Sequence, residues 1–193
     1  MSAVLPIVER FHSLQGEGAH FGKSAFFIRL GGCEVGCPWC DTKESWSKTK
    51  HEQIHVLDLA EEAKKAQSQG AGILIITGGE PLHHNLNLLC DAIRNRTSTI
   101  NGHNMPIHLE TSGVDEITGS IDWLTLSPKR HAKPKKNLLR ACNEIKVVIQ
   151  QEEDLLFAEE MAKQSTYEKQ IFSTKQSNHN ENNFKPHLFL QPG

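Results

Sequence analysis

Short apolar runs that alternate with helix-like segments constrain the fold of this chain more than any other feature. Residues 25–30 (AFFIRL), 73–77 (ILIIT) and 145–149 (IKVVI) have the almost wholly apolar character of strands covered on both faces. Residues 55–69 and 86–93 instead carry apolar side chains at helical spacing. This alternation predicts an α/β fold built on a mainly parallel sheet.

Weaker patterns extend the alternation toward both ends of the chain. They predict three further strands and one further helix, at residues 4–11, 107–111, 123–126 and 155–161 respectively. Pro6 is expected to break the first of these strands. The polar, Asn-rich segment 173–185 has no periodicity and predicts a loop insert within a single domain that spans residues 1–193.

Charge and composition argue against several classes of partner. The formal net charge of -2 provides no excess of Lys and Arg for a nucleic-acid-binding face. No stretch approaches the roughly 18 to 20 apolar residues that span a bilayer. The N-terminus also lacks the basic start and long apolar run of a secretion signal. We therefore expect a cytoplasmic protein with no membrane and no nucleic acid partner.

Three of the five cysteines, Cys33, Cys37 and Cys40, lie within eight residues directly after an apolar run. In a reducing compartment such a cluster favours metal binding over disulfides, and thiolates suit zinc or iron–sulfur clusters. Structural zinc takes four protein ligands, whereas three cysteines leave one iron of a four-iron cluster open. The pattern therefore favours an iron–sulfur cluster, with a zinc knuckle completed by His12, His20 or a distant cysteine as the alternative.

A glycine-rich motif follows the next apolar run, at Gly78, Gly79, Glu80 and Pro81. Glycines allow a ligand to approach the backbone closely, and a glutamate can bind an ammonium group. Taken alone, the same four residues also fit a strand-to-helix turn with a capping acid. The two motifs together predict ligand chemistry at the carboxyl ends of the strands, where parallel sheets place their sites.

The spacing Cys33-x3-Cys37-x-Trp39-Cys40, followed by the glycine motif at 78–81, resembles the radical S-adenosylmethionine (SAM) superfamily. In that superfamily three cysteines hold a [4Fe-4S] cluster, and the open iron binds SAM, which is cleaved to a 5′-deoxyadenosyl radical. The resemblance implies a partial radical SAM-type barrel of mainly parallel strands. It also implies that the radical forms on the cofactor, so no side chain is assigned as the catalyst.

More specifically, the chain resembles the 7-carboxy-7-deazaguanine synthase family. The motifs that carry this resemblance are LQGEG at 14–18, Arg29, CDT at 40–42, ETSG at 110–113, SPK at 127–129 and NEIK at 143–146. The family contracts the ring of 6-carboxy-5,6,7,8-tetrahydropterin with loss of ammonia, a lyase reaction of queuosine and deazapurine biosynthesis. The resemblance also implies Mg²⁺, a homodimer, and an electron donor such as flavodoxin or ferredoxin.

The resemblance assigns a role to individual residues. It implies substrate contacts from Leu14, Gln15, Gly16, Glu17, Arg29 and Thr77. It implies SAM contacts from Trp39, Cys40, Asp41, Gly79, Glu80, Ser127, Pro128 and Lys129. Thr42 would offer its hydroxyl oxygen to Mg²⁺, a hard ion that prefers oxygen ligands.

Each assignment has a purely structural alternative. LQGEG could be only a turn, Arg29 a surface ion pair, Thr42 a helix N-cap, and residues 127–129 a loop. For the whole chain, the alternatives are a glycyl-radical-activating enzyme that acts on a protein and a non-catalytic zinc- or cluster-binding module. Chains of the family continue beyond residues 190–192 with another helix and strand, so we expect the barrel to lack both.

Overall fold

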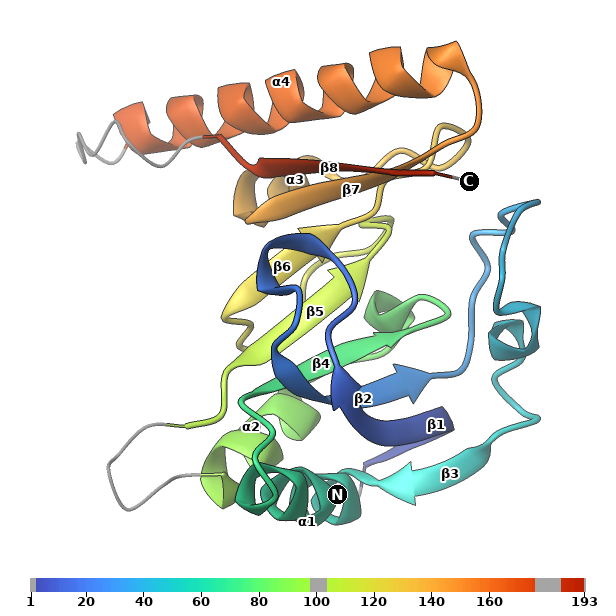
Figure 1. Cartoon of the computed structure of the whole chain (residues 1–193), viewed down its shortest axis with the longest axis vertical. Coiled ribbons are helices and arrows are strands. Elements are labelled where there is room, and N and C mark those ends of the chain that lie inside the picture. Colours follow the sequence, from blue (N-terminus) through green and yellow to red (C-terminus); the bar gives the residue numbers. More distant parts are fainter. Residues whose placement is uncertain (1–2, 98–103, 176–184, 193) are drawn as a thin grey trace. The chain divides into compact units, whose positions relative to one another are not determined.

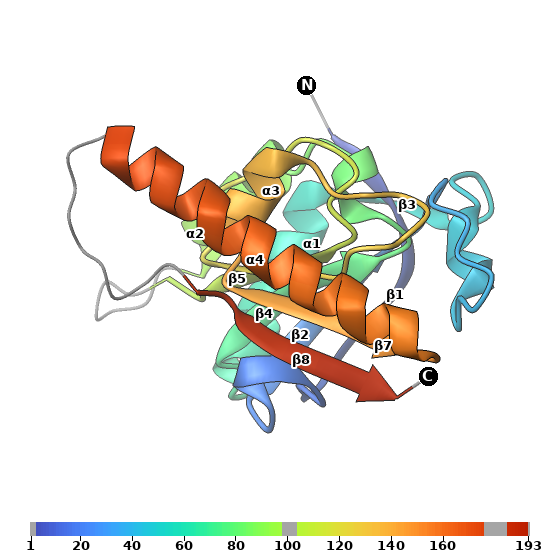
Figure 2. The same ribbon diagram turned by 90° about the horizontal axis from the view of Figure 1, so that it is seen from above.

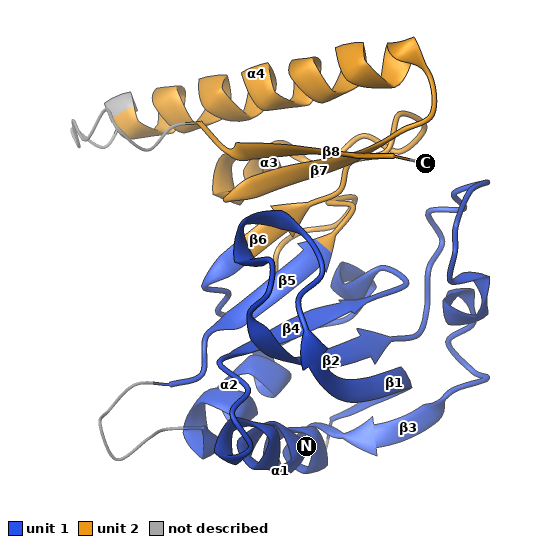
Figure 3. Cartoon of the chain, viewed as in Figure 1, with its two compact units in different colours: residues 1–110, 118–123 blue, residues 111–117, 124–193 orange. Residues whose placement is uncertain are grey.

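The computed structural model describes residues 3–97, 104–175 and 185–192. The described residues form eight strands and four α-helices in an order that follows the predicted alternation (Figure 1). They group into two compact units (Figure 3). Unit 1 comprises residues 1–110 and 118–123, and unit 2 comprises residues 111–117 and 124–193. The division of the chain into units leaves the single-domain assignment a prediction.

Unit 1 is built on five strands that are hydrogen-bonded in the order β3-β1-β2-β4-β5. Their bounds are β1 Val4–Leu14, β2 Ser24–Leu30, β3 Glu52–His55, β4 Ile73–Gly78 and β5 Ile107–Thr111. β1 runs antiparallel to both β2 and β3, whereas β2, β4 and β5 are parallel to one another. The carboxyl ends of these three parallel strands therefore lie at one edge of the sheet.

The core of unit 1 lies between this sheet and two helices, α1 (Val56–Ser68) and α2 (Asn87–Arg96). β4 is buried along residues 73–76, which explains its continuous apolar sequence. The helix α1 buries Leu59, Ala60, Ala63 and Ala66, together with its first residue, and these are the positions at helical spacing. Burial on both faces of a strand and on one face of a helix thus produces the patterns seen in the sequence.

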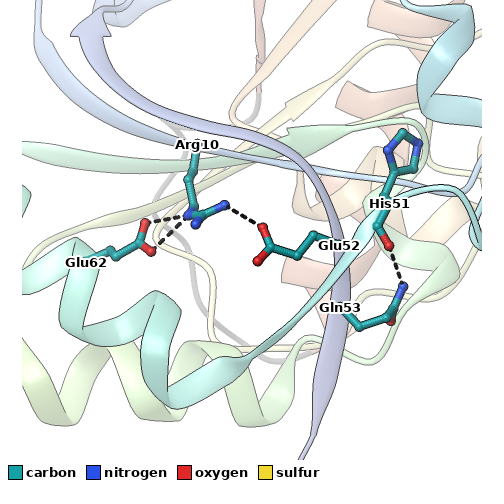
Figure 4. A network of polar contacts seen from close by, with 5 residues as sticks. All are labelled: Arg10, His51, Glu52, Gln53 and Glu62. Carbon is teal, nitrogen blue, oxygen red and sulfur yellow. Dashed lines mark hydrogen bonds and ion pairs between the residues drawn. The ribbon is translucent and has the colours of Figure 1, made fainter.

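Arg10 ties β1 to two neighbouring elements at the surface of unit 1 (Figure 4). Its Nε lies 2.7 Å from one carboxylate oxygen of Glu62 and 2.9 Å from the other, and its Nη1 lies 3.4 Å from Glu52. The hydrogen bond that Arg10 donates to Glu62 is the main cause of the raised pKa of Arg10. Because the network is partly exposed, we treat it as a contribution to the placement of α1 and β3 rather than as a large stability term.

Unit 2 contains three parallel strands in the order β6-β7-β8 and two helices. The bounds are β6 Trp123–Leu126, α3 Lys136–Ala141, β7 Glu144–Ile149, α4 Glu152–Lys175 and β8 His187–Pro192. α4 packs against α3 and β7, as the view from above shows (Figure 2). None of the described helices is both long enough and apolar enough to cross a membrane.

Two sequence predictions are wrong in this structure. β1 continues through Pro6, because a proline lacks only the backbone N–H. Pairing with β2 begins at Ile7, and the Pro6 carbonyl still accepts the N–H of Gly31 at 2.8 Å. The predicted insert at 173–185 begins inside α4, which extends to Lys175. Residues 176–184 of that insert lie outside the described residues.

Candidate functional site

The three clustered cysteines lie on the loop between β2 and β3, at the carboxyl end of a parallel strand. Cys33, Cys37 and Cys40 are free thiols and are partly exposed. The Cys40 N–H donates to the Cys37 carbonyl at 3.1 Å, and Gly36 adopts a φ of 69°, a left-handed conformation that suits glycine. Together these features fold the cysteine segment into a tight loop rather than a packed element.

The glycine-rich turn after β4 packs directly against the start of this loop. The Gly79 N–H donates to the Leu30 carbonyl and the Glu80 N–H to the Gly32 carbonyl, each at 2.9 Å. A Cβ added to Gly79 would lie 2.6 Å from the Gly32 oxygen and 2.8 Å from the Cβ of Cys33. A side chain at position 79 would therefore force the turn and the first cysteine apart.

The donor set on this loop fits an iron–sulfur cluster. Thiolates are the ligands that such clusters take, and a four-iron cluster binds each of its cysteines through a different iron. In the parts of the chain that the structure describes, no three His, Cys, Asp or Glu side chains converge as they would on one metal ion. Burial is the main cause of the raised pKa of the Cys33 thiol.

The two histidines weighed as zinc ligands are engaged elsewhere. The Nε2 atom of His12 lies 2.7 Å from the Oγ of Ser24. The ring of His20 packs against His108 and Trp123, with a centroid distance of 4.5 Å in each case. Both histidines therefore have local partners within the sheet and its first loop.

Glu80, which the resemblance assigns to SAM, also makes a capping contact. The side chain is only 1% exposed, and its Oε1 accepts the N–H of Leu82 at 3.0 Å. That contact caps the 3-10 turn at Pro81–His83. The structural alternative for this residue is therefore realised, and it fixes the carboxylate beside the glycine turn.

Two residues assigned to the substrate meet at a carboxylate that the sequence motifs left without a role. The Nε2 of Gln15 donates to Oε1 of Glu110 at 3.0 Å, and the hydroxyl of Thr77 donates to Oε2 at 3.1 Å. Thr77 and Glu110 lie near the carboxyl ends of the neighbouring parallel strands β4 and β5. The structure thus assembles one polar cluster from three segments far apart in the sequence. The sequence signals for Glu110 were its position near a strand end and its place in the ETSG motif, which assigned it no role.

The LQGEG segment forms a closed turn between β1 and β2. The Gln15 N–H donates to the Lys23 carbonyl at 2.8 Å, and the Gly22 N–H donates to the Gln15 carbonyl at 2.7 Å. The Glu17 N–H also donates to the side-chain oxygen of Gln15, at 3.3 Å. These contacts orient the Gln15 amide, so its nitrogen faces Glu110.

His20 holds the end of the same segment against β5. His108 lies on β5 two residues before Glu110, its ring packs at a tilt against that of His20, and Trp123 completes the cluster. His108 is buried, which together with nearby positive groups lowers its pKa to about 4. The segment between β1 and β2 is therefore anchored to β5 at two points, the Gln15 amide and the His20 ring.

For Arg29, the structural alternative of a surface ion pair is realised: its Nε donates to Glu9 at 2.6 Å in a partly exposed ion pair.

For Thr42, the structural alternative of a helix N-cap is not realised. The residue precedes the 3-10 turn at Lys43–Trp46, but its side chain makes no capping hydrogen bond. The Thr42 hydroxyl instead donates to Asp41 at 2.8 Å. Trp39, on the same loop, is partly exposed.

A third segment that the resemblance assigns to SAM, Ser127–Lys129, follows β6 and belongs to unit 2. Within that unit the Ser127 N–H donates to the Thr111 carbonyl at 2.7 Å. The Lys129 ammonium group donates to the Ser127 hydroxyl at 2.9 Å. The segment is thus a hydrogen-bonded loop at a strand end.

Two residues that match no family motif contact the cysteine loop. The N–H of Glu34 donates to Nε2 of His83 at 3.1 Å, and Nε2 of His84 donates to the Gly31 carbonyl at 2.7 Å. Burial is the main cause of the lowered pKa of His84. The sequence assigned these histidines no role, although their position directly after the glycine motif was a signal that they would lie close to it.

Comparisons with known proteins agree with this arrangement. The model of the Radical SAM superfamily matches residues 27–125. A 7-carboxy-7-deazaguanine synthase from Prochlorococcus marinus is 72% identical over 193 residues, which cover 100% of this chain and 85% of the relative. A synthase of the same name from Synechocystis is 48% identical over 154 residues, covering 80% of this chain and 69% of the relative.

A solved structure extends the agreement to the fold. The crystal structure of QueE from Escherichia coli matches with a TM-score of 0.69 at 31% identity, over 98% of this chain and 83% of that chain. The predicted fold, a partial radical SAM-type barrel of mainly parallel strands, is therefore confirmed. The chain belongs to the 7-carboxy-7-deazaguanine synthase family of the radical SAM superfamily.

Proposed function

We propose that this protein converts 6-carboxy-5,6,7,8-tetrahydropterin to 7-carboxy-7-deazaguanine with loss of ammonia, as a carbon–nitrogen lyase of queuosine biosynthesis. The observation that carries the proposal is the cluster in which Gln15 and Thr77 both donate to Glu110 near the ends of β4 and β5. In sequence, Gly79 follows two residues after Thr77, and its turn packs against Cys33. The identity of 72% to a relative that bears this enzyme name supports the same reaction.

The cofactor site of the proposal follows from the cysteine loop. Cys33, Cys37 and Cys40 would ligate a [4Fe-4S] cluster, and the turn at Gly79, which packs against Cys33, would place its backbone beside the cluster and SAM. When bound, the cluster and SAM supply the 5′-deoxyadenosyl radical that removes a hydrogen atom from the substrate. The side chains and backbone proposed to contact SAM are those of Trp39, Cys40, Asp41, Gly79, Glu80, Ser127, Pro128 and Lys129.

The substrate site of the proposal uses hydrogen-bonding groups of the first turn. Leu14, Gly16 and Glu17 would present backbone and carboxylate groups to the pterin edge, beside the oriented amide of Gln15. Arg29 would bind the substrate carboxylate. The ion pair with Glu9 uses only Nε, which leaves the two terminal amino groups of this guanidinium as donors.

Thr42 is the proposed protein ligand of Mg²⁺. Its hydroxyl hydrogen is directed at Asp41, so the oxygen lone pairs remain able to accept a cation. Mg²⁺ keeps several waters and needs few protein ligands, which suits a single hydroxyl on a partly exposed loop. In the proposal this ion orients the substrate carboxylate.

The proposal also includes the setting in which the enzyme works. We place it in the cytoplasm as one radical SAM core domain that forms a homodimer and accepts electrons from a flavodoxin or ferredoxin. Radical chemistry of this kind needs a reductant for the cluster, which is why an electron-transfer partner belongs to it. The family membership supports these features as a group.

An anaerobic assay tests the proposed reaction. Protein reconstituted with iron and sulfide is reduced and incubated with SAM, Mg²⁺ and the carboxy-tetrahydropterin, and the product is identified by mass spectrometry. We expect about four irons per chain and a product of the mass of 7-carboxy-7-deazaguanine, both lost in Cys37→Ala. Iron loading without this product would contradict the substrate, and about one zinc with no iron would contradict the cluster.

A further inference from the structure

Trp46 makes a contact with the cysteine loop that the proposed reaction leaves without a role. It ends the 3-10 turn Lys43–Trp46, six residues after Cys40. Its indole N–H donates to the Sγ of Cys40 over a distance of 3.4 Å. An indole nitrogen is a donor only, so this contact has a fixed direction from the ring to the sulfur.

The backbone of the same residue holds another cysteine of the loop. The Cys33 N–H donates to the Trp46 carbonyl at 3.1 Å, and the Gly32 N–H donates to the Ser45 carbonyl at 2.6 Å. Trp46 therefore contacts the first cysteine through its backbone and the third through its side chain. Cys33 and Cys40 are consequently tied to one residue that follows the cysteine segment 33–40.

The turn that carries Trp46 is itself held in place. Ser45 is 1% exposed, and its hydroxyl donates to the Thr42 carbonyl at 2.7 Å. The Ser45 N–H donates to the same carbonyl at 2.9 Å. A short turn held by two hydrogen bonds of Ser45 thus places the indole beside Cys40, although Trp46 is 36% exposed.

The chemistry of the acceptor determines what this contact does. A neutral thiol is a weak acceptor, whereas a thiolate bound to iron carries negative charge and accepts more strongly. Reduction of a cluster adds an electron and increases the negative charge on its sulfur ligands. A hydrogen bond to one of these sulfurs therefore stabilises the reduced form more than the oxidised form and raises the reduction potential.

We propose that Trp46 is a positioning residue which holds Cys33 and Cys40 and, through its N–H···S contact, raises the reduction potential of the cluster bound by the three cysteines. The inference rests on the cluster of the proposed function but not on its pterin substrate. It predicts that the indole N–H eases reduction of the cluster by the electron donor.

A redox titration followed by electron paramagnetic resonance tests this proposal on the reconstituted full chain without substrate. Trp46→Phe keeps an aromatic ring and removes the N–H, and Trp123→Phe is the matched control because its indole packs against His20. At the midpoint potential of the wild type, we expect the ratio of reduced to oxidised cluster to fall roughly three- to tenfold in Trp46→Phe, as one hydrogen bond contributes. The control should match the wild type.

A second variant separates the N–H from the fit of the ring. Benzothienylalanine at position 46 has the shape of tryptophan but lacks the N–H, so it should show the same shift with full iron content. An unchanged midpoint in both Trp46 variants, or an equal shift in Trp123→Phe, would overturn the proposal. If Trp46→Phe loses iron while the benzothienylalanine variant keeps its iron and shows a shifted midpoint potential, both the positioning role and the effect on the potential are supported. Failure of pterin turnover would not affect this readout.

Discussion

Glu110 joins two segments that the sequence assigns separately to the substrate. It accepts one hydrogen bond from Gln15 and another from Thr77, and it does so with both carboxylate oxygens. A carboxylate at this place orients the Gln15 amide, because the amide nitrogen must face it. In the proposed function, binding of the pterin edge would therefore depend in part on Glu110, a residue that need not touch the pterin.

Glu110→Gln tests this dependence. The neutral amide offers one acceptor oxygen where the carboxylate offers two, so Gln15 or Thr77 loses its partner. We expect kcat/KM for the pterin to fall roughly tenfold or more, while iron content stays at the wild-type value. Steady-state kinetics against Glu116→Gln, which alters an exposed pair with Lys135 in unit 2, provides the comparison. Equal kinetics in the two variants would refute the role of Glu110.

Thr42→Ala removes the hydroxyl proposed to bind Mg²⁺. The substitution should lower turnover at limiting Mg²⁺ by roughly tenfold, with partial recovery at high Mg²⁺, because the remaining ligands are substrate and water. Iron content and the cluster spectrum should not change. Turnover measured across a Mg²⁺ series decides the point, and a dependence identical to that of the wild type would exclude Thr42 as a ligand.

His108 makes the stability of unit 1 sensitive to acid. Its pKa is about 4 in the folded protein, below the ordinary value of 6.5. As the pH falls, His108 therefore takes up a proton in the unfolded chain before it does so in the folded protein. The contribution of neutral, buried His108 to the free energy of unfolding is complete above pH 6.5 and is lost as the pH falls toward 4. When the pH is lowered from about 7 to about 5, the free energy of unfolding should fall in both proteins. The fall should be smaller in His108→Gln than in the wild type, by up to about 2 kcal/mol.

Urea unfolding at the two pH values measures this difference. His12→Gln, which alters an exposed histidine of β1, should retain the acid sensitivity of the wild type. A wild-type slope in His108→Gln would show that the acid sensitivity arises elsewhere.

Among the elements, the turn after β4 sets the position of the cysteine loop. Gly79→Ala would place a Cβ 2.6 Å from the Gly32 oxygen and 2.8 Å from the Cβ of Cys33. We expect a loss of roughly 1 to 3 kcal/mol in unfolding free energy, together with poor iron loading, because the turn has to move away from the loop. Thermal unfolding and iron analysis of the reconstituted protein measure both effects.

Gly72→Ala is the matched control for that substitution. A Cβ at position 72 would meet only the Ser24 carbonyl, at an ordinary contact distance of 3.7 Å. The control should load iron like the wild type. Equal loading in Gly79→Ala would show that the close approach at position 79 is not required by the cluster.

The elements also show how far the sequence determines the fold. β2 and β4 were predictable because burial on both faces makes each strand almost wholly apolar. β3 was not predictable, since Ile54 is its only buried residue. The strand is instead defined by its backbone pairing with β1, which lies far from it in the sequence. The strand β8 was also missed: none of its residues is buried, and its pairing with β7 is a tertiary contact.

The same distinction applies to the site. The cysteine spacing and the glycine motif are local, so the loop and its likeness to radical SAM enzymes could be inferred from short stretches of sequence. The cluster at Glu110 joins residues that are 95 and 33 positions apart, and no pattern within either segment specifies that meeting. The indole contact of Trp46 likewise depends on the conformation of the loop.

At the scale of the whole molecule, the motifs of the family resemblance are distributed over both compact units. The cysteine segment, the glycine turn and the cluster at Glu110 belong to unit 1, whereas Ser127–Lys129 belongs to unit 2. The family resemblance covers both units, since the 72% identity extends over 100% of this chain. The central claim of the proposed function is that the chain generates a radical and uses it on the pterin.

Transfer of a hydrogen isotope tests that claim most directly. The reduced, iron-loaded chain is incubated with SAM, Mg²⁺ and 6-carboxy-tetrahydropterin that carries deuterium at C6, and the 5′-deoxyadenosine formed is analysed by mass spectrometry. We predict one deuterium in the 5′-deoxyadenosine together with formation of 7-carboxy-7-deazaguanine. Cleavage of SAM without deuterium transfer, in a protein with full iron content, would contradict the account.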